Sequence, residues 1–475
     1  MNVTIVGAGY VGLVTAVGLA RVGHTVTCVD RDKGRIEAIA AGRAPFHEPG
    51  LDRLLKKQLE ALRLRATTNL QLALRGSQVS IIAVGTPSTD AGIDLRFIRE
   101  AAREIGTELR QLEPYHVVVV KSTVVPSTTD SVVRGELEAA SGMVAGIDFG
   151  LAVNPEFLSE GRAVADFIWP DRIVIGAACA RARSTMAEMY ARFGCPVVHT
   201  TPRNAEMIKY AANALQATLI SFSNEIASIC ESVSGLDEET VMQGVHLDRC
   251  WSAPQRDRSI FAGAVSYLRA GMGFGGSCFP KDLRALRAFA HGEGVEVPIL
   301  ESVLRVNEER ATRVVNLLVD SMGTVGGKRI AVLGLAFKPE TSDVRESPGI
   351  RIARLLLKRG GKVVVHDPMV TMDTARAELG PSIRYVPSVP AAAAGADAMI
   401  IATGWDAYRS IDWAQVAPLM RSPVVFDGRQ VVTATHAVAN GVKLLSTGRC
   451  SERPALGRDK VGSRVDMKGD AHVVQ

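Results

Sequence analysis

Short apolar runs alternate with longer segments of helical periodicity through the first 200 residues. The apolar runs are NVTIV at the start, VSIIAV (79–84), HVVVV (116–120), GLAV (150–153) and RIVIG (172–176), each bounded by turn residues. Nearly continuous apolar strands separated by helices are typical of a parallel sheet covered on both faces. The pattern therefore predicts an α/β fold.

The first 30 residues predict a strand, a glycine-rich turn, a helix and a second strand ending at Asp30. The turn has the GxGxxG spacing of a dinucleotide-binding unit. Gly7 permits the tight turn, Gly9 lets the backbone approach a pyrophosphate, and Gly12 lets the helix pack on the strand. The acid favours the ribose hydroxyls of NAD over the 2′-phosphate of NADP, although Arg31 adjoins it. We predict an N-terminal Rossmann NAD-binding domain; a nucleotide-free Rossmann-like fold is the alternative.

A long Ala-rich segment of helical periodicity runs from Arg203 to about Cys230. It contains Lys209 and Asn213 on a face that otherwise predicts burial. A lysine there is disfavoured unless it is paired or functional. Glu225, on the same segment, is interpreted as a structural acid. We predict a central connecting helix.

A second strand–helix–strand unit follows, with KRIAVLGLAFKP, a helix through LLLKRG and then KVVVHDP. Asp367 stands where Asp30 stands in the first unit. The three-glycine fingerprint is absent, so we predict a C-terminal Rossmann-like domain that binds substrate and holds no second dinucleotide. Strands at 396–403 and 423–428 extend its sheet.

The length of 475 residues exceeds what one core usually organises. We predict an NAD-binding domain at 1–202, a central helical domain at 203–320 and a Rossmann-like substrate-binding domain at 321–448. Residues 449–475 are polar and without periodicity, which predicts a disordered tail.

Charge and cysteine usage narrow the class further. The net charge is +5, and basic residues are interleaved with acidic ones along the chain. The sequence therefore indicates no basic surface for nucleic acid. No apolar run reaches membrane-spanning length and the first residue leads into a strand, so we expect neither a signal peptide nor membrane insertion, and a cytoplasmic protein. Seven cysteines without CxxC or metal-like spacing predict reduced thiols and no metal site.

The stretch GFGGSCFPKD, residues 273–282, places a thiol, an ammonium and a carboxylate behind glycines. Lys281 could favour the thiolate of Cys278 and so raise its nucleophilicity. The alternative is a glycine-rich turn that holds an inert, buried cysteine, and Lys281 could form a local ion pair with Asp282.

Several motifs together resemble the UDP-glucose dehydrogenase family of nucleotide-sugar 6-dehydrogenases. They are GAGYVG, VGTP (84–87), STVVP (122–126), NPEFLSEG (154–161), AEMIKYAANA (205–214), GFGGSCFPKD, GLAFKPETSDVRESP (334–348), ATGWDAYR and FDGR. Ser127 departs from the glycine that many relatives have after STVxP, and the segment 249–266 is longer than expected. The family arginine that reaches the substrate of the partner subunit could therefore be Arg249 or Arg258.

The resemblance implies a four-electron oxidation of UDP-glucose at C6 by a homodimer, with two NAD molecules used in succession. A thiol suits the second oxidation, because an aldehyde becomes a hydride donor only after a nucleophile adds. The implied catalytic residues are the nucleophile Cys278, Lys209 and Asn213 for the oxyanions, Asp282 and Thr123 in the proton network, and Glu156 as base for thioester hydrolysis.

The resemblance also implies two sets of ligand contacts, whose members in isolation could be solvated charges. The substrate set is Glu156, Phe157, Leu158, Ser159, Glu160, Lys209, Asn213, Tyr267, Leu268, Arg269, Ala270, Gly271, Gly275 and Lys338. The cofactor set is Gly7, Gly9, Tyr10, Val11, Gly12, Asp30, Arg35, Thr86, Thr123, Glu160, Lys281 and Arg345.

Three alternatives remain at the level of sequence. One is a sister enzyme acting on GDP-mannose or an N-acetylated UDP-sugar. The second is a two-electron β-hydroxyacid dehydrogenase, which shares the Rossmann domain and long helix but has no use for a nucleophilic thiol. The third is a non-catalytic sensor, which does not require the thiol, lysine and carboxylates to be retained together.

Overall fold

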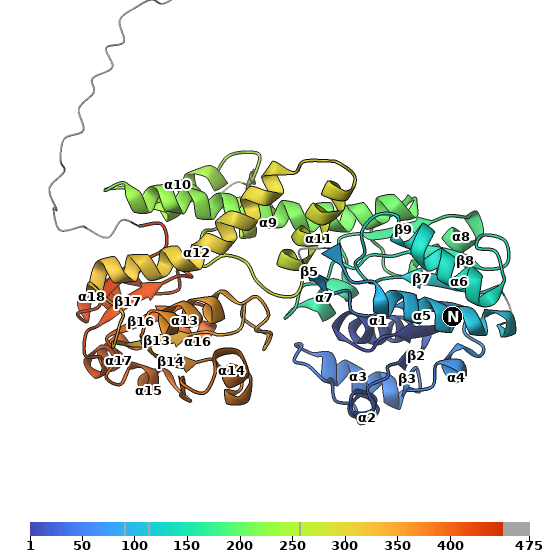
Figure 1. Cartoon of the computed structure of the whole chain (residues 1–475), viewed down its shortest axis with the longest axis horizontal. Helices are drawn as coiled ribbons and strands as arrows, with labels where there is room; N and C mark the ends of the chain where they lie inside the picture. The colour runs from blue at the N-terminus through green and yellow to red at the C-terminus, as the bar shows by residue number, and fades with distance from the viewer. Residues whose placement is uncertain (90–91, 113–114, 256–257, 450–475) are drawn as a thin grey trace, which may run out of the picture.

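Two α/β units lie along one long helix in the computed structural model, which describes residues 1–89, 92–112, 115–255 and 258–449 (Figure 1). The helix, α9 (Pro202–Ser232), has 31 residues and confirms the predicted central helix. Thr201 caps it by accepting a hydrogen bond from the Asn204 N–H, and Pro202 occupies the first turn, where it costs no hydrogen bond. The predicted tail lies outside the described residues from 450 onward.

The N-terminal unit is built on an eight-stranded sheet in the order β10-β9-β8-β7-β4-β1-β2-β3. Its strands are β1 (Asn2–Val6), β2 (Thr25–Val29), β3 (Leu64–Thr67), β4 (Val79–Ile82), β7 (Val117–Val120), β8 (Gly150–Val153), β9 (Ile173–Ala177) and β10 (Val197–Thr200). Its helices are α1 (Tyr10–Arg21), α2 (Lys33–Ala40), α3 (Leu51–Glu60), α4 (Leu70–Leu74), α5 (Arg96–Glu108), α6 (Arg134–Ser141), α7 (Ala163–Ile168) and α8 (Ala180–Tyr190). A two-stranded ribbon, β5 (Ser88–Thr89) with β6 (Gly92–Ile93), lies beside it.

The prediction of a wholly parallel sheet is wrong at one step. Strands β8 and β9 pair antiparallel, with Ala152 opposite Ala177 and Val153 opposite Gly176, while the other pairs of this sheet are parallel. Both strands are buried along their whole length. A strand covered on both faces gives the same apolar run whichever way it points, so the pattern carried no information on direction.

The C-terminal unit has a parallel sheet in the order β15-β14-β13-β16-β17-β18. Its strands are β13 (Arg329–Leu333), β14 (Lys362–His366), β15 (Arg384–Tyr385), β16 (Ala398–Ile401), β17 (Val424–Asp427) and β18 (Lys443–Ser446). Its helices are α13 (Pro348–Lys358), α14 (Met372–Leu379), α15 (Val389–Ala393), α16 (Asp406–Arg409), α17 (Trp413–Val416) and α18 (Ala434–Ala439). The predicted Rossmann-like second unit is confirmed.

The middle of the chain adds α10 (Glu238–His246), the antiparallel hairpin β11 (Ser252–Gln255) and β12 (Arg258–Phe261), α11 (Phe279–Gly292) and α12 (Pro298–Met322). Arg310 of α12 is buried, donating from Nη2 to Glu231 of α9 at 2.7 Å and from Nε to the Gly271 carbonyl at 2.8 Å. Arg310 thereby joins the two long helices, α9 and α12, to the loop before α11. No helix in the described ranges combines the length and apolarity needed to cross a bilayer.

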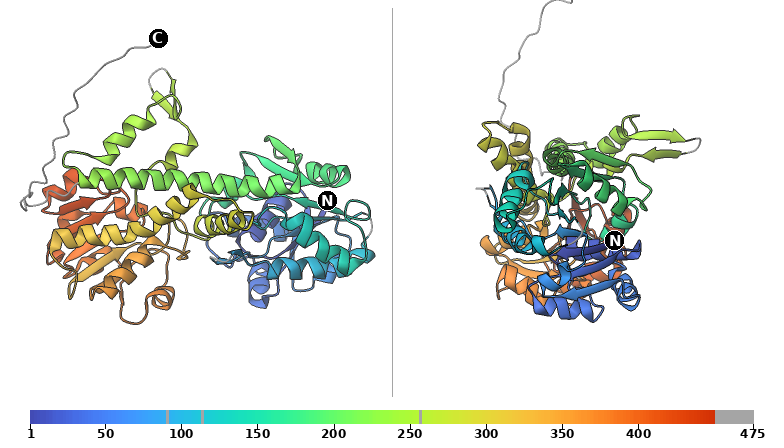
Figure 2. Two further views of the ribbon diagram at one scale, coloured as in Figure 1. Left: turned by 45° about the horizontal axis from the view of Figure 1, so that its top comes forward. Right: turned by 90° about the vertical axis from the view of Figure 1, so that its right-hand side faces the viewer.

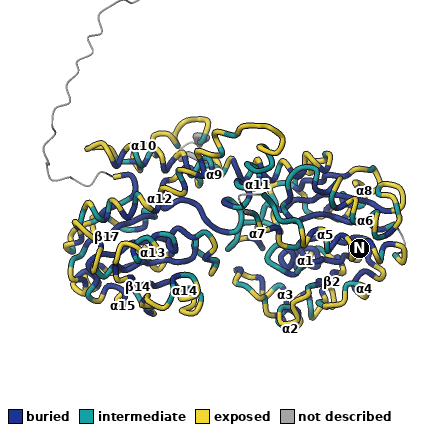
Figure 3. Tube along the Cα trace, in the orientation of Figure 1, coloured by how far each residue is buried: buried dark blue, intermediate teal, exposed yellow. Residues whose placement is uncertain are grey.

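One face of α9 remains uncovered. Leu215, Phe222 and Ile229 are 62%, 47% and 52% exposed at a spacing of seven residues. A seven-residue spacing keeps these side chains on one side of the helix. The central strands of both sheets are buried, whereas α10 carries many exposed positions (Figure 3). The β11–β12 hairpin projects away from the two units (Figure 2).

Candidate active site

The turn between β1 and α1 has the geometry that its glycines predict. Gly7 has a φ of +101°, and an added Cβ would lie 2.6 Å from the Ala83 carbonyl oxygen. A Cβ on Gly12 would overlap the Gly7 carbonyl oxygen, so α1 packs directly on the turn. On Gly9, no atom of the described residues lies within 4 Å of such a position. The turn therefore fits the close approach of a pyrophosphate at the start of α1, where Tyr10 and Val11 begin the helix.

Asp30 follows β2 at the edge of this turn. Its Oδ2 accepts hydrogen bonds from the Ala8 N–H at 2.8 Å and from Arg35 Nη1 at 2.9 Å. Burial raises the pKa of Asp30, but the N–H groups of Asp32 and Ala8 and the Arg35 guanidinium together hold it below its usual value. The carboxylate is half-buried and ionised, as a ribose acceptor requires.

Arg31 does not face this carboxylate. Its guanidinium pairs with Glu100, at 2.6 Å, and with Glu104, both on α5. The cation that could have accommodated a 2′-phosphate is therefore held on a neighbouring helix, which favours NAD.

Two further contacts hold loops around the predicted cofactor site. Tyr10 donates from its hydroxyl to Glu48, whose Oε2 also accepts the Gly161 N–H at 2.8 Å. Thr86 donates from Oγ1 to the Thr123 carbonyl at 2.9 Å. The loop after β8 is thus joined to the start of α1 through Glu48, and the loops after β4 and β7 are joined to each other.

Lys209 and Glu156 form a buried ion pair. The Lys209 Nζ lies 3.0 Å from Glu156 Oε1, and the two side chains are 4% and 6% exposed. Burial raises the pKa of Glu156, but the Lys209 charge, the Leu158 N–H and the Lys121 charge lower it overall. Burial likewise lowers the pKa of Lys209, but Glu156, Cys278 and Asp282 raise it overall. Both groups are therefore charged inside the protein.

Cys278 caps the N-terminus of α11, with its Sγ 3.6 Å from the Ser277 hydroxyl. Burial, followed by the charge of Glu156, raises the pKa of this thiol to about 11, and the Lys209 charge acts against that rise. The raised pKa favours a protonated thiol at neutral pH. Lys209 is the main cation that favours the thiolate, and the charges of Lys338 and Arg345 interact with the sulfur as well.

Lys281 pairs with a carboxylate, so its predicted effect on the Cys278 thiol stays a prediction. Lys281 forms the local ion pair with Asp282 that was the alternative interpretation. Asp282 is buried, and its other oxygen accepts a hydrogen bond from Asn213 Nδ2 at 2.6 Å. Lys281, the sequence neighbour of the thiol, is thus paired with Asp282. The charge of Lys209 on α9, 69 positions before Cys278 in the chain, acts on the sulfur.

The glycines before Cys278 make room for the C-terminal unit. A Cβ on Gly275 would overlap the Glu346 carbonyl oxygen, and one on Gly276, which has a φ of +81°, would lie 2.7 Å from the Phe337 ring. The Gly276 N–H donates to the Arg345 carbonyl at 2.9 Å. The segment that carries the nucleophile is therefore pressed directly against the loop after β13.

The loop after β8 also contacts the C-terminal unit. Lys338 donates from Nζ to the Ser159 hydroxyl at 2.9 Å. Glu160 accepts hydrogen bonds from Ser277 and Thr341 and lies 3.6 Å from Arg345. Burial, followed by the Asp343 charge, raises the pKa of Glu160 to about 7. Of this loop, Phe157 stacks under Arg172, with the guanidinium carbon 3.9 Å from the ring centroid.

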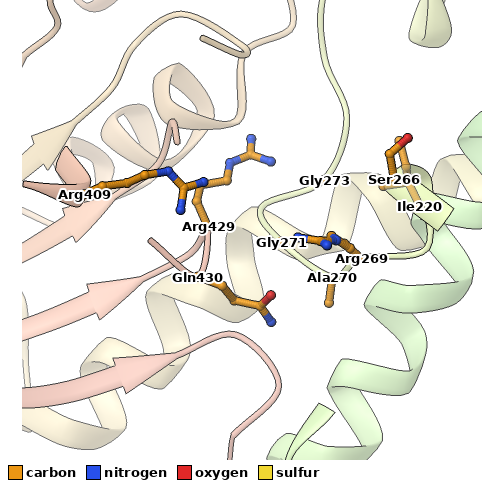
Figure 4. Close-up of a pocket in the computed structure, with 9 residues that line it drawn as sticks. All are labelled: Ile220, Ser266, Arg269, Ala270, Gly271, Gly273, Arg409, Arg429 and Gln430. Atoms are coloured by element: carbon orange, nitrogen blue, oxygen red, sulfur yellow. The ribbon is translucent and has the colours of Figure 1, made fainter. Parts of the chain in front are cut away.

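A cavity of about 260 Å³ lies between the loop before α11 and the C-terminal unit (Figure 4). It is lined by Ile220, Ser266, Arg269, Ala270, Gly271, Gly273, Arg409, Arg429 and Gln430. Three of the five predicted residues 267–271 line it. The other two contact elsewhere, since the Leu268 carbonyl accepts from His246 and the Tyr267 ring packs near Phe279.

Arg429 is a site residue that the sequence analysis missed, although its motif FDGR carries the resemblance. Its Nε donates to the Ala402 carbonyl at 2.7 Å, while its buried Nη2 has no partner among the described residues. Burial lowers its pKa to about 10. A guanidinium with a free donor facing a cavity can bind an anion.

The two arginines considered for the partner subunit belong to the segment between α10 and the end of the β11–β12 hairpin. Arg249 is exposed after α10, and Arg258 begins β12. Ser127, which replaces the glycine of many relatives, has a φ of +74°, in the left-handed region that glycine favours. The departure therefore preserves the backbone conformation.

Three family models match the chain, for the UDP-glucose/GDP-mannose dehydrogenase NAD binding domain at residues 1–194, the central domain at 203–309 and the UDP binding domain at 331–434. The chain belongs to this family. The UDP-glucose 6-dehydrogenase AglM of Haloferax volcanii is 43% identical over 439 residues, covering 91% of this chain and 97% of the relative.

Two solved structures of similar proteins extend the comparison. A UDP-glucose dehydrogenase from Pyrobaculum islandicum has a TM-score of 0.85 at 41% identity, covering 94% of this chain and 98% of its own. A UDP-D-ManNAc dehydrogenase from Pyrococcus horikoshii has a TM-score of 0.81 at 27% identity, covering 94% and 99%. Family membership sets aside the β-hydroxyacid dehydrogenase, and the fold is shared by enzymes for different nucleotide sugars.

The glycine turn of this dehydrogenase supplies a matched pair of variants. Gly12→Ala should lower the melting temperature and abolish NAD binding, because its methyl overlaps the turn itself. Gly9→Ala should leave the melting temperature unchanged and still weaken NAD binding, because its methyl occupies only the open space in front of the turn. Thermal melting and NAD titration by calorimetry measure the two effects. Equal behaviour of the two variants would contradict the assignment.

The charges around Cys278 predict opposite shifts in thiol reactivity. Glu156→Gln removes the charge that raises the thiol pKa, so alkylation of Cys278 at pH 8 should become faster. Lys209→Met removes the opposing charge and should slow it. About tenfold in either direction corresponds to one pKa unit. Peptide mass spectrometry after timed iodoacetamide exposure measures the rate, with buried Cys28 as the internal control.

Proposed function

We propose that this enzyme oxidises UDP-glucose at C6 to UDP-glucuronate, with NAD as the acceptor and two NADH released. The observation that carries the proposal is the convergence of Cys278, Lys209 and Glu156 in one buried cluster at the junction of three parts of the chain. The relatives named as UDP-glucose 6-dehydrogenases support the same substrate.

In the proposed reaction, NAD would be held by Gly7, Gly9, Gly12 and Asp30 and would supply the hydride acceptor for each oxidation at C6. The chain itself stabilises the charges on oxygen. Lys209, buried and protonated, can stabilise the oxyanion of the alcohol and later of the thiohemiacetal. Asn213 is positioned by Asp282 to share that task.

Cys278 supplies the covalent step in this proposal. Its sulfur bonds to the aldehyde carbon, and the thiol proton leaves to a neighbouring base as the thiohemiacetal forms. After the second hydride leaves, the carbon is a thioester. Glu156, which is ionised beside Lys209, can take a proton from the water that cleaves it.

The cavity is proposed to hold the nucleotide diphosphate. Arg269, Arg409 and Arg429 line it from two sides (Figure 4). Guanidinium groups bind phosphate oxygens through paired N–H donors. The match of residues 331–434 to the UDP binding domain supports this location.

A related sugar remains the second candidate, since the P. horikoshii dehydrogenase has the same fold. NADH release from UDP-glucose, GDP-mannose and an N-acetylated UDP-sugar under equal conditions separates the candidates. A kcat/KM for either rival above that for UDP-glucose would replace the proposed substrate.

We propose a homodimer in which the exposed stripe on α9 packs against a second copy. Exposed apolar side chains at regular helical spacing are a surface that association covers. The β11–β12 hairpin would then lie near the partner, with Arg249 and Arg258 as candidates to reach its site.

We propose that residues 1–202 bind NAD, residues 203–320 serve dimerisation and catalysis, and residues 321–448 bind the UDP-sugar. Reduced thiols, expected from the odd cysteine count, support a cytoplasmic location.

Replacing the nucleophile tests the covalent mechanism. Wild-type enzyme should release two NADH per UDP-glucose and yield the uronic acid. Cys278→Ala should bind the sugar and NAD but form almost no acid, because the aldehyde becomes a hydride donor only after a nucleophile has added to it. Cys278→Ser should be a poor substitute, since an alkoxide is harder to form than a thiolate. NADH counting with product mass measures this, and full acid formation by Cys278→Ala would exclude the thioester.

The dimer is tested on the α9 stripe. Phe222→Glu places a charge in the proposed interface and should give a monomer by light scattering, with activity reduced. Ile147→Glu makes the same kind of exchange at a site that is 73% exposed in the N-terminal unit, and should leave mass and activity unchanged. Monomeric, fully active wild-type enzyme would contradict the proposal.

A further inference from the structure

Lys121 is a second buried lysine beside the catalytic cluster. It follows β7 directly and is 4% exposed. Its Nζ donates to Asn154 Oδ1 at 2.9 Å and lies 3.4 Å from the Asn154 carbonyl oxygen. Within the described residues, both of these hydrogen bonds end on a residue that carries no charge.

A buried ammonium without a carboxylate partner is costly. Burial lowers the pKa of Lys121 to about 8, although the Glu156 charge acts in the opposite direction. The Asn154 side chain is held firmly, accepting from the Tyr190 hydroxyl at 2.6 Å and donating to the Val174 carbonyl at 2.8 Å. Lysines are rarely buried unless they are paired or functional.

The position of Lys121 relates it to Glu156, two residues beyond Asn154. The charged and titratable groups around the Glu156 carboxylate come from three elements: Lys209 from α9, Lys121 from the end of β7, and the Cys278 thiol at the start of α11. Of these three groups, Lys209 forms a direct ion pair with the carboxylate, at 3.0 Å. Lys209 is also the group that the proposed reaction assigns to the substrate oxyanion.

We propose that Lys121 is a positioning residue that supplies a second buried positive charge to Glu156 and so keeps this base ionised while Lys209 serves the substrate. The inference rests on the proposed function, in which Glu156 acts in thioester hydrolysis. In that step a C–O bond forms between water and the thioester carbon, and the C–S bond breaks. The sulfur leaves as thiolate, and Glu156 takes the proton from the water.

The sign of the effect follows from charge. Glu156 accepts a proton only when ionised, so the hydrolysis rate falls as the pH drops through its pKa. A nearby cation lowers that pKa, by about 1–3 units at close range. Removing the charge of Lys121 should therefore move the acid limb of the hydrolysis rate to higher pH, by about one unit.

The experiment follows the acyl-enzyme on Cys278 in single turnovers with UDP-glucose and excess NAD. Samples are quenched across a pH series, and intact mass gives the fraction of enzyme still carrying the sugar. Lys121→Gln, which is neutral but can still donate to Asn154, should shift the acid limb upward. Lys121→Arg keeps the charge and should leave the limb near its wild-type position. NAD binding and thermal melting check that each variant folds, and Lys121→Met is the second neutral variant.

Tyr190→Phe is the matched control for structure alone. It removes a hydrogen bond to the same Asn154 oxygen without changing any charge, so the acid limb should stay where it is. An unmoved limb in folded Lys121→Gln or Lys121→Met overturns the inference. An equal shift in Tyr190→Phe or Lys121→Arg also overturns it, because distortion would then explain the effect.

Glu156→Gln separates this inference from the proposed function. It should accumulate the acyl-enzyme at every pH. If no covalent species forms on Cys278 in that variant or in wild type, the proposed mechanism itself fails, and the role of Lys121 fails with it. If the species forms and only the Lys121 variants behave as wild type, the function stands and the inference alone is wrong.

Discussion

The buried pair between Lys209 and Glu156 is the interaction on which the site depends. Two charges removed from water are stable only when each has the other and further polar partners. Glu156 has the Leu158 N–H, and the pair joins α9 to the loop after β8. Asn213 lies four residues after Lys209, so it shares the same face of α9, and it holds Asp282. One face of α9 thereby positions Glu156 through Lys209 and Asp282 through Asn213, and both acidic residues act on the Cys278 thiol.

The glycine run before Cys278 acts on the other side of the same cluster. Its backbone touches the C-terminal unit at Phe337 and Glu346, where no Cβ has room. The sequence analysis considered these glycines as a glycine-rich turn. The structure shows that they also permit contact between segments, since the loop after β13 packs on Gly275 and Gly276, and Lys338 of the same loop donates to Ser159.

Local pattern predicted the parts of the fold that depend on local chemistry. The β1–α1 turn needs glycine at defined positions, and α9 needs a long periodic segment with a capped start, so both could be identified. The direction of β9 could not be, since burial on both faces hides it. Lys281 was considered as the partner of Cys278 because it is near in sequence, yet the main cation that acts on the thiol, Lys209, comes from α9. Lys121 and Arg429 were missed because their importance arises from burial and an unpaired donor, which only the folded chain reveals.

Asp30 and Asp367 show how equivalent positions acquire different roles. Both follow the second strand of a Rossmann-like unit. Asp30 is half-buried and receives one N–H from the turn, which leaves it open to a ribose. Asp367 is buried, and accepts N–H groups from Leu335 and Ala336 on one oxygen and from Met369 and Val370 on the other. A carboxylate used in this way closes its own turn. Asp367 is therefore not free to bind a ligand in the second unit. Asp427 instead shapes the turn after β17, where its oxygens accept the N–H groups of Arg429, Val431 and Val432. That turn directs the Arg429 guanidinium to the cavity.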